Sequence, residues 1–213
     1  MLPLVVFTVG HSTRTIEAFV HLLKAHGIER VIDVRAIPRS RHNPQFARDQ
    51  LSSALQRFRI HYSHLPGLGG FRRPRKDSRN TGWQNASFRG YADYMETAVF
   101  KTTLKQCLAL AKQERVVLMC AEAVPWRCRR SLIADALLAR GVDVREITSA
   151  AATRPYALRP WARVNGTDVT YPAAAFEGLP EGGHVASPDV QHIDQPFLRS
   201  RGRPEKDSGR EAP

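Results

Sequence analysis

Apolar residues in the first 149 positions of the chain alternate between short continuous runs and helical stripes. The continuous runs are typical of strands that are covered on both faces of a parallel sheet. In the stripes, apolar residues recur at intervals of three and four, which is the period of an amphipathic helix. The expected strands are Leu4–Val9, Val31–Val34, Ile60–Leu65, Val116–Met119 and Val142–Ile147, and the expected helices run from Ile16 to about Gly27, from Pro44 to Arg59, around Phe88–Met95 and Leu104–Ala111, and from Cys128 to Arg140.

This order of elements predicts a single Rossmann-like α/β domain over residues 1–149. We expect a doubly wound, mostly parallel sheet with helices on both faces. Beyond residue 149 the pattern stops, and residues 151–213 contain eight of the 14 prolines and six of the 14 glycines. Residues 150–213 are therefore expected to form a Pro/Gly-rich, mostly disordered tail, with at most a short docking segment between Trp161 and Tyr171.

Local signals also indicate where the first helices begin. Ser12 or Thr13 can accept a hydrogen bond from the first turn of the helix that follows the first strand. Asn43 and Pro44 are suited to the cap and the first position of the next helix.

The composition restricts the class of protein. A chain of 213 residues with 42% hydrophobic content can bury one core. No apolar run approaches the ~18 residues that a membrane helix needs, and the first ten residues lack the basic segment and the cleavage site of a signal peptide. We therefore expect a cytoplasmic protein without a membrane partner, and its three cysteines are expected to be free thiols.

Positive charge is concentrated in one part of the sequence. The formal net charge is +12, and residues 1–150 hold 24 Lys and Arg against 12 Asp and Glu, whereas the rest holds 8 of each. Residues 35–89 alone contain 12 basic side chains, 11 of them arginines, against Asp49 and Asp77. Because the guanidinium fork matches phosphate geometry, this stretch predicts a nucleic acid or a nucleotide as partner. The alternative is a solvated basic face that only aids solubility.

The turn between the strand 116–119 and the helix 128–140 carries most of the reactive side chains. Open α/β sheets bind their ligands at the carboxyl ends of strands, where this turn lies. Flanking arginines and a helix start lower the pKa of a thiol, and a carboxylate there can relay protons or anchor an arginine. The candidate catalytic residues are Cys120, Glu122, Cys128 and Arg130. The alternative is a pair of inert, buried thiols.

Two well-known kinds of site do not fit this turn. A phosphatase loop needs Cys-x5-Arg, whereas Arg127 is the seventh residue after Cys120. A structural zinc site needs a second pair of ligands, which the spacing of Cys120 and Cys128 does not provide. We therefore expect no metal, and the sequence identifies neither a cofactor nor an oligomeric state.

Residues of three other loops are candidates for substrate binding. The turn before the first helix would hold an anion on free backbone N–H groups, or would only cap that helix. A buried strand carboxylate at Asp33 is costly unless paired, and Arg35 is its nearest partner, either in a site or only to hold the loop. The long loop after residue 65 combines glycines with arginines and aromatics that can stack on bases, although the aromatics also fit one face of a helix. The candidate substrate-binding residues are Gly10, His11, Ser12, Asp33, Arg35, Ser40, Gly69, Gly70, Arg89 and Tyr91.

Five separated motifs resemble, in order and spacing, the bacterial family described as domain of unknown function 488. They cover roughly residues 5–148 and read GHST, VIDVRAIPRSRHNPQF, YSHLPGLGG, WQNASFRGYADYM and LMCAEAVPWRCRRSLIADAL. The resemblance implies a compact Rossmann-like α/β domain and leaves the activity unassigned. The family pattern ends in Cys-His-Arg, whereas Arg129 follows Cys128 here. Because arginine cannot act as a general base near neutral pH, proton transfer at this position would be lost or altered.

Three functions fit these features. The first is an enzyme that uses Cys120 or Cys128 on a nucleotide or on a base or end of a nucleic acid. The second is a noncatalytic, basic nucleic-acid-binding module, and the third is a redox sensor in which the two thiols form a reversible disulfide. We favour the enzyme, because a binding face alone needs no convergence of acid, thiol and arginines. In that case Cys120, Glu122, Asp33 and His11 are expected to line one cleft.

Overall fold

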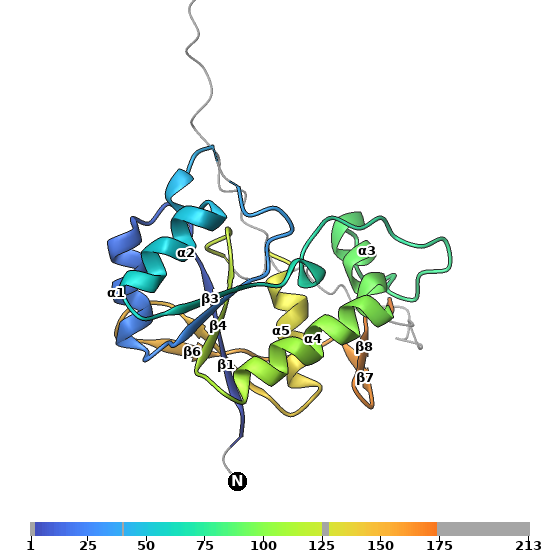
Figure 1. Ribbon diagram of the computed structural model, residues 1–213. Helices are drawn as coiled ribbons and strands as arrows, with labels where there is room; N and C mark the ends of the chain where they lie inside the picture. The colour runs from blue at the N-terminus through green and yellow to red at the C-terminus, as the bar shows by residue number, and fades with distance from the viewer. Residues whose placement is uncertain (1–2, 40, 125–127, 174–213) are drawn as a thin grey trace, which may run out of the picture. The chain divides into compact units, whose positions relative to one another are not determined.

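The computed structural model describes residues 3–39, 41–124 and 128–173 (Figure 1). All of them belong to one unit, which spans Met1–Ala175. Its centre is a six-stranded sheet in the order β3-β2-β4-β1-β5-β6. The strands are β1 (Val5–Gly10), β2 (Arg30–Asp33), β3 (His61–His64), β4 (Val116–Cys120), β5 (Asp143–Ile147) and β6 (Thr153–Pro155).

The first five strands are parallel, and β6 pairs with β5 in antiparallel fashion. The predicted α/β class with a mostly parallel sheet is therefore confirmed. The central strand β4 is buried along its whole length, as its uninterrupted apolar sequence predicts.

Helices cover both faces of the sheet (Figure 1). Alternate residues of a strand point to opposite faces, so β4 contributes to two separate cores. Val117 and Met119 pack in one core with residues of α1 (Ile16–Ala25) and α2 (Arg48–Arg57). Leu118 and Cys120 pack in the other core, with residues of α3 (Ala86–Met95), α4 (Ala98–Ala111) and α5 (Arg130–Leu138).

This topology creates a crevice at the carboxyl edge of the sheet. The chain leaves β2 toward α2 on one face, and it leaves the neighbouring β4 toward α5 on the opposite face. Ligands of open α/β sheets bind where the connections diverge in this way. The carboxyl end of β1 lies beside that of β4, with Gly10 in register with Cys120. The turns after three strands therefore meet at one place.

Helix starts differ from the sequence predictions. The cap of α1 is Thr15, whose hydroxyl accepts a hydrogen bond from the Ala18 amide at 3.2 Å, and not Ser12 or Thr13. The helix expected from Pro44 begins instead as a short 3-10 turn, η1 (Pro44–Phe46), and α2 follows after an extended Ala47. The break arises because the Phe46 ring is held in the core, where it packs edge-on against Phe19 with ring centroids 5.3 Å apart.

The ordered unit extends beyond residue 149, which the sequence suggested as its boundary. Besides β6, the chain adds a hairpin of β7 (Arg163–Asn165) and β8 (Asp168–Thr170). A buried ion pair fixes this segment: Arg159 Nη1 lies 2.5 Å from an oxygen of Asp135 on α5. The fully buried Tyr171 hydroxyl donates to the same carboxylate at 2.7 Å. Residues 150–173 therefore belong to the described fold and not to the predicted tail, and residues 174–213 lie outside the described residues.

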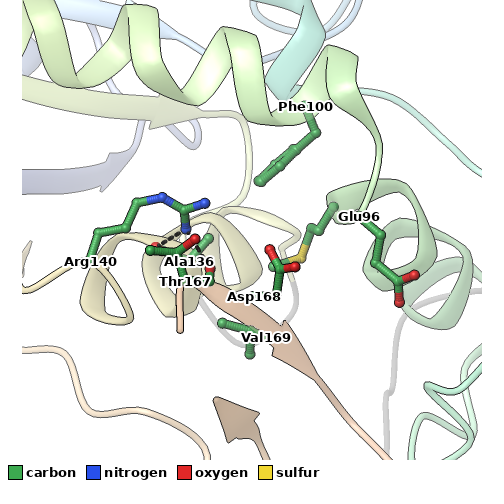
Figure 2. Close-up of a pocket in the computed structure, with 8 residues that line it drawn as sticks. Glu96, Phe100, Ala136, Arg140, Thr167, Asp168 and Val169 are labelled. Atoms are coloured by element: carbon green, nitrogen blue, oxygen red, sulfur yellow. Dashed lines mark hydrogen bonds between the residues drawn. The ribbon is translucent and has the colours of Figure 1, made fainter. Parts of the chain in front are cut away.

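The hairpin is also hydrogen-bonded to the residue Arg140, which follows α5 (Figure 2). Arg140 donates from Nη1 to the carbonyl of Ala136 at 2.7 Å and to that of Thr167 at 2.9 Å. The pocket beside it, which reaches Phe100 and Val169, has a volume of only about 10 Å³. That space holds about one water molecule, so this pocket is not a ligand site.

The loop before α3 is tied down by one acidic residue. Asp93 accepts hydrogen bonds from the Arg75 amide, the Ser78 hydroxyl and the Asn80 amide group at 2.8, 2.6 and 2.8 Å. Burial alone would raise the pKa of Asp93, but these donors outweigh it and lower that pKa. Much of this loop is thus held as part of the fold.

None of the helices in the described residues is long and apolar enough to cross a membrane.

Candidate active site at the carboxyl edge of the sheet

A cavity of about 510 Å³ lies at the carboxyl edge of the sheet. We call it the carboxyl-edge cavity. Its size falls within the range of small-molecule sites, about 300–1,000 Å³. Its lining includes eight residues that the sequence selected: His11, Arg35, Gly69, Gly70, Cys120, Glu122, Cys128 and Arg130. Of the four residues expected to share one cleft, His11, Cys120 and Glu122 line the cavity, and Asp33 lies behind them, fully buried.

The two thiols of the turn form a contact pair. Cys120 is buried at the end of β4, Cys128 is half-buried just before α5, and their sulfur atoms are 2.9 Å apart. The hydrogen bond from Cys120, together with the nearby Arg130 guanidinium, lowers the pKa of Cys128 from 9.0 to about 7. The same interaction and burial raise the pKa of Cys120 well above its ordinary range. Cys128 is therefore the thiol of the pair that ionises more readily, and once ionised its sulfur accepts the hydrogen bond from Cys120.

Arg130 is a buried cation that has no carboxylate partner among the described residues. Its side chain is 1% exposed, and Nη1 lies 3.4 Å from the sulfur of Cys120. Its Nε and Nη2 groups have no hydrogen-bond partner within the described part of the chain. Buried guanidinium groups are normally paired. Arg130 therefore places a positive charge with unused, buried donors in the lining of the cavity.

Arg129 joins the mouth of the cavity to α3. Its Nη2 donates to the hydroxyl of Ser87, and its guanidinium lies 4.2 Å from the centre of the Phe71 ring. Its buried Nε has no acceptor in the described residues. Phe71 nevertheless remains 83% exposed.

A second polar group supports the floor of the cavity. Asp33 accepts from Arg35 Nε at 2.9 Å and Nη2 at 2.6 Å, and from the Tyr62 hydroxyl at 2.8 Å. Arg35 also donates to the Phe46 carbonyl at 2.8 Å, so it links the end of β2 to η1. The expected partnership of Asp33 and Arg35 is present, and it holds the loop.

His11 is neutral in this setting. Its ring stacks on Phe46 with centroids 4.1 Å apart, and Nδ1 donates to the Ser12 carbonyl at 2.8 Å. The other nitrogen, Nε2, then accepts from Arg35 Nη1 at 3.2 Å. Burial, with the positive charge of Arg35, lowers the pKa of His11 to about 4. Both ring nitrogens are used, so His11 is poorly suited to carrying protons during a reaction.

The backbone of the turn after β1 makes hydrogen bonds that hold the fold together. The amides of His11 and Ser12 donate to the carbonyls of Cys120 and Ala121 at 2.9 and 3.0 Å. A Cβ atom on Gly10 would lie 1.8 Å from the Glu122 carbonyl oxygen, so only glycine fits there. These two amides are therefore not available to an anion. Ser12 borders a separate, shallower depression with Glu122.

The glycines of the loop at 69 and 70 shape the cavity wall. A Cβ on Gly69 would meet the Val34 carbonyl at 2.3 Å, which explains the glycine by close backbone packing. Gly70 has φ of +102°, which other residues rarely adopt.

Two predicted binding residues do not reach the cavity. Tyr91 is fully buried in α3, and its hydroxyl donates to the Leu68 carbonyl at 2.5 Å, so it cannot stack on a base. Arg89 lies on the same helix, outside the cavity lining. Ser40 lies outside the described residues.

The sequence did not select several residues that line the cavity. They are Ile37, Arg39, Phe71, Arg72 and Arg129. The arginine-rich composition pointed to this region, but nothing in the sequence distinguishes an exposed phenylalanine from a core one. Within the described residues, no group of three His, Cys, Asp or Glu side chains is arranged to hold a metal ion.

Comparison with known proteins identifies a family but no characterised relative. No curated protein and no solved structure matches the chain. The model of one family, described as "Domain of unknown function DUF488", matches residues 15–137, more than half of the sequence. The chain therefore belongs to the DUF488 family.

Proposed function

We propose that this protein is a cysteine-dependent enzyme that acts on a nucleotide or on a nucleic-acid base or end. The observation that carries the proposal is the thiol of Cys128, which is half-buried in a ligand-sized cavity and has a pKa lowered to about 7. A thiol that needs only to pack in a core gains nothing from such a shift, whereas a nucleophile does.

In this proposal the residues of the turn have different roles. The Cys128 thiolate attacks an electrophilic atom of the substrate and forms a covalent bond to sulfur, while the leaving group departs with the electron pair of the bond that breaks. Water then cleaves the bond to sulfur and restores the thiolate. In the ionised pair the Cys120 thiol donates a hydrogen bond that stabilises the Cys128 thiolate. Glu122 is exposed on the cavity wall, where its carboxylate can take a proton from the water that breaks the bond to sulfur. His11 is excluded from this role by its two ring hydrogen bonds.

A screen for turnover tests the proposal. Pools of nucleotides and short oligonucleotides are incubated with the protein, and their masses are followed by liquid chromatography and mass spectrometry. We expect one class of compound to be consumed by the natural protein and left intact by Cys128→Ser. Cys107→Ser is the matched control, because that thiol is buried in the core, away from the cavity. Equal consumption by Cys128→Ser and the natural protein would refute the nucleophile.

The 2.9 Å separation of the two sulfur atoms also favours a second candidate, a redox sensor. A hydroperoxide would oxidise the Cys128 thiolate to a sulfenic acid and release an alcohol or water. The Cys120 thiol would then displace water from that sulfur and close a disulfide. The measurement is the intact mass after mild peroxide: a sensor loses two hydrogen atoms reversibly and shows no turnover in the screen.

A further inference from the structure

The carboxyl-edge cavity contains more positive charge than its own residues neutralise. Among the described residues of its lining, Glu122 is the one carboxylate, and it is exposed. Arg35 is neutralised by Asp33. Arg129 and Arg130 have no ion-pair partner within the described part of the chain.

The unused donors belong to consecutive residues. Arg130 offers Nε and Nη2, and Arg129 offers Nε, and all three groups are buried without an acceptor in the described residues. An unpartnered buried guanidinium costs folding free energy, so a ligand that supplies the missing acceptors explains why it is present. Two guanidiniums with several N–H groups match the oxygens of a phosphoryl group in geometry and charge.

The mouth of the cavity has a different character. Phe71 and Ile37 both line it, and they are 83% and 72% exposed. One face of the Phe71 ring is covered by the Arg129 guanidinium. The other is free for a flat ring to stack on, as bases do on aromatic side chains in nucleic-acid-binding proteins.

We propose that the cavity binds a terminal phosphate monoester joined to an aromatic base, with the phosphoryl group on Arg130 and Arg129 and the base against Phe71. The inference rests on the proposed function and specifies its substrate: a nucleoside monophosphate, or the phosphorylated end of a nucleic acid, both of which present this chemistry. Arg129 places a second cation next to Arg130 in the cavity lining and thereby favours the doubly charged phosphate.

Binding is measured by calorimetry on the full chain that carries Cys128→Ser, which separates affinity from thiol chemistry. The probes are the four ribonucleoside 5′-monophosphates, the corresponding nucleosides, inorganic phosphate, and a short oligonucleotide with and without a 5′-phosphate. We expect at least one monophosphate to bind tenfold or more tightly than its nucleoside. If the phosphate increases the affinity of the oligonucleotide more than that of the nucleoside, the ligand is a nucleic-acid end. If it increases the affinity of the nucleoside more, the ligand is a free nucleotide.

Variants locate the two halves of the ligand. Arg130→Gln should weaken phosphate-bearing probes by about tenfold to a hundredfold, the usual range for removal of one charge-assisted hydrogen bond. Arg129→His should weaken them less and should leave the nucleosides unchanged. Phe71→Ala should weaken the nucleoside monophosphate severalfold and leave inorganic phosphate unchanged. The control is Arg163→Gln, an exposed arginine of β7 far along the chain, and circular dichroism checks each fold.

Equal binding of nucleoside and monophosphate would overturn the proposal, as would unchanged phosphate binding in both Arg130→Gln and Arg129→His. If Arg130→Gln does not fold, the exposed Phe71→Ala and the half-buried Arg129→His still decide the matter. Phosphate-dependent binding without turnover would leave the anion site standing and remove the enzyme. Turnover of a substrate without phosphate would support the enzyme and refute the phosphate site.

Discussion

The hydrogen bond between the two thiols makes a quantitative prediction about reactivity. Replacing Cys120 by alanine removes the first cause of the lowered Cys128 pKa, so that pKa should rise from about 7 toward 9.0. At pH 7 the fraction of thiolate would then fall from about one half to, at the limit, about one in a hundred. Each remaining thiolate would be about eightfold more nucleophilic, because nucleophilicity rises with pKa at a Brønsted slope of 0.4–0.5.

The two effects oppose each other and produce curves that cross. With iodoacetamide in excess, Cys120→Ala should label about sixfold more slowly than the natural protein at pH 7 and up to about sevenfold faster at pH 10. Cys107 does not interfere, because burial raises its pKa to about 12. The assay is the labelling rate of Cys128 by peptide mass spectrometry between pH 5 and 10, with Cys107→Ala as control. An unchanged midpoint in Cys120→Ala would refute the assigned direction of the hydrogen bond.

Three further predictions concern stability and charge. Arg159→Met should destabilise the fold by about 3–5 kcal/mol in urea unfolding, because it leaves the buried Asp135 carboxylate unpaired. The control is Arg163→Met at an exposed position, which should change stability by less than about 0.5 kcal/mol. Similar losses in both variants would contradict the role of the ion pair. Folding lowers the pKa of His11 from 6.5 to about 4. The free energy of unfolding should therefore decrease by up to about 3 kcal/mol as the pH drops from 6.5 to 4, with no contribution from His11 above pH 6.5. Urea unfolding of His11→Gln should lack that part of the pH dependence. The loop that contains Arg72, Arg73, Arg75 and Lys76 tests nucleic-acid binding. If it binds nucleic acid, replacing these four residues by alanine should reduce the slope of log affinity against log salt by about 0.7–0.9 for each phosphate that is no longer neutralised, with little change in thermal unfolding. A salt-independent affinity of the natural protein in fluorescence anisotropy would argue against such binding.

The sequence predicted the central sheet well for a physical reason. Strands such as Val116–Cys120 are covered on both faces, so every residue along them is both apolar and buried. The short edge strand β6, Thr153–Pro155, has no such pattern and is mostly exposed. It is held by pairing with β5, and the segment after it is held by the ion pair of Asp135 and Arg159, whose partners lie 24 positions apart.

The candidate site was predicted in its chemistry and less well in its geometry. Topology alone brings the turns after β1, β2 and β4 together, and therefore Cys120, Glu122 and His11 could be grouped from sequence. Whether a polar residue faces the cavity or the core depends on packing. Tyr91 and Phe71 show the limit, because the tyrosine that looked suited to stacking is buried and the phenylalanine is exposed.

The spatial arrangement of charge also differs from the count along the chain. Arg75 and Arg79 both pair with Glu96, at 3.0 and 3.2 Å, although that glutamate lies outside the most basic stretch of the sequence. Exposed pairs of this kind contribute little to stability but reduce the local field. The excess of positive charge that matters for a ligand is therefore better placed at Arg129 and Arg130 than in the loop.

A covalent bond between Cys128 and a substrate fragment can be detected by mass spectrometry during turnover. A reaction with the substrate from the screen is quenched with acid, and the peptide that contains Cys128 is analysed by tandem mass spectrometry. Glu122→Gln is the variant of choice, because removal of the proton carrier should slow the breakdown of a covalent intermediate. We predict a fragment of the substrate on the sulfur of Cys128, at a higher level in Glu122→Gln than in the natural protein. Unmodified Cys128 in samples of both proteins that are converting substrate, or a fragment on another residue, would contradict it.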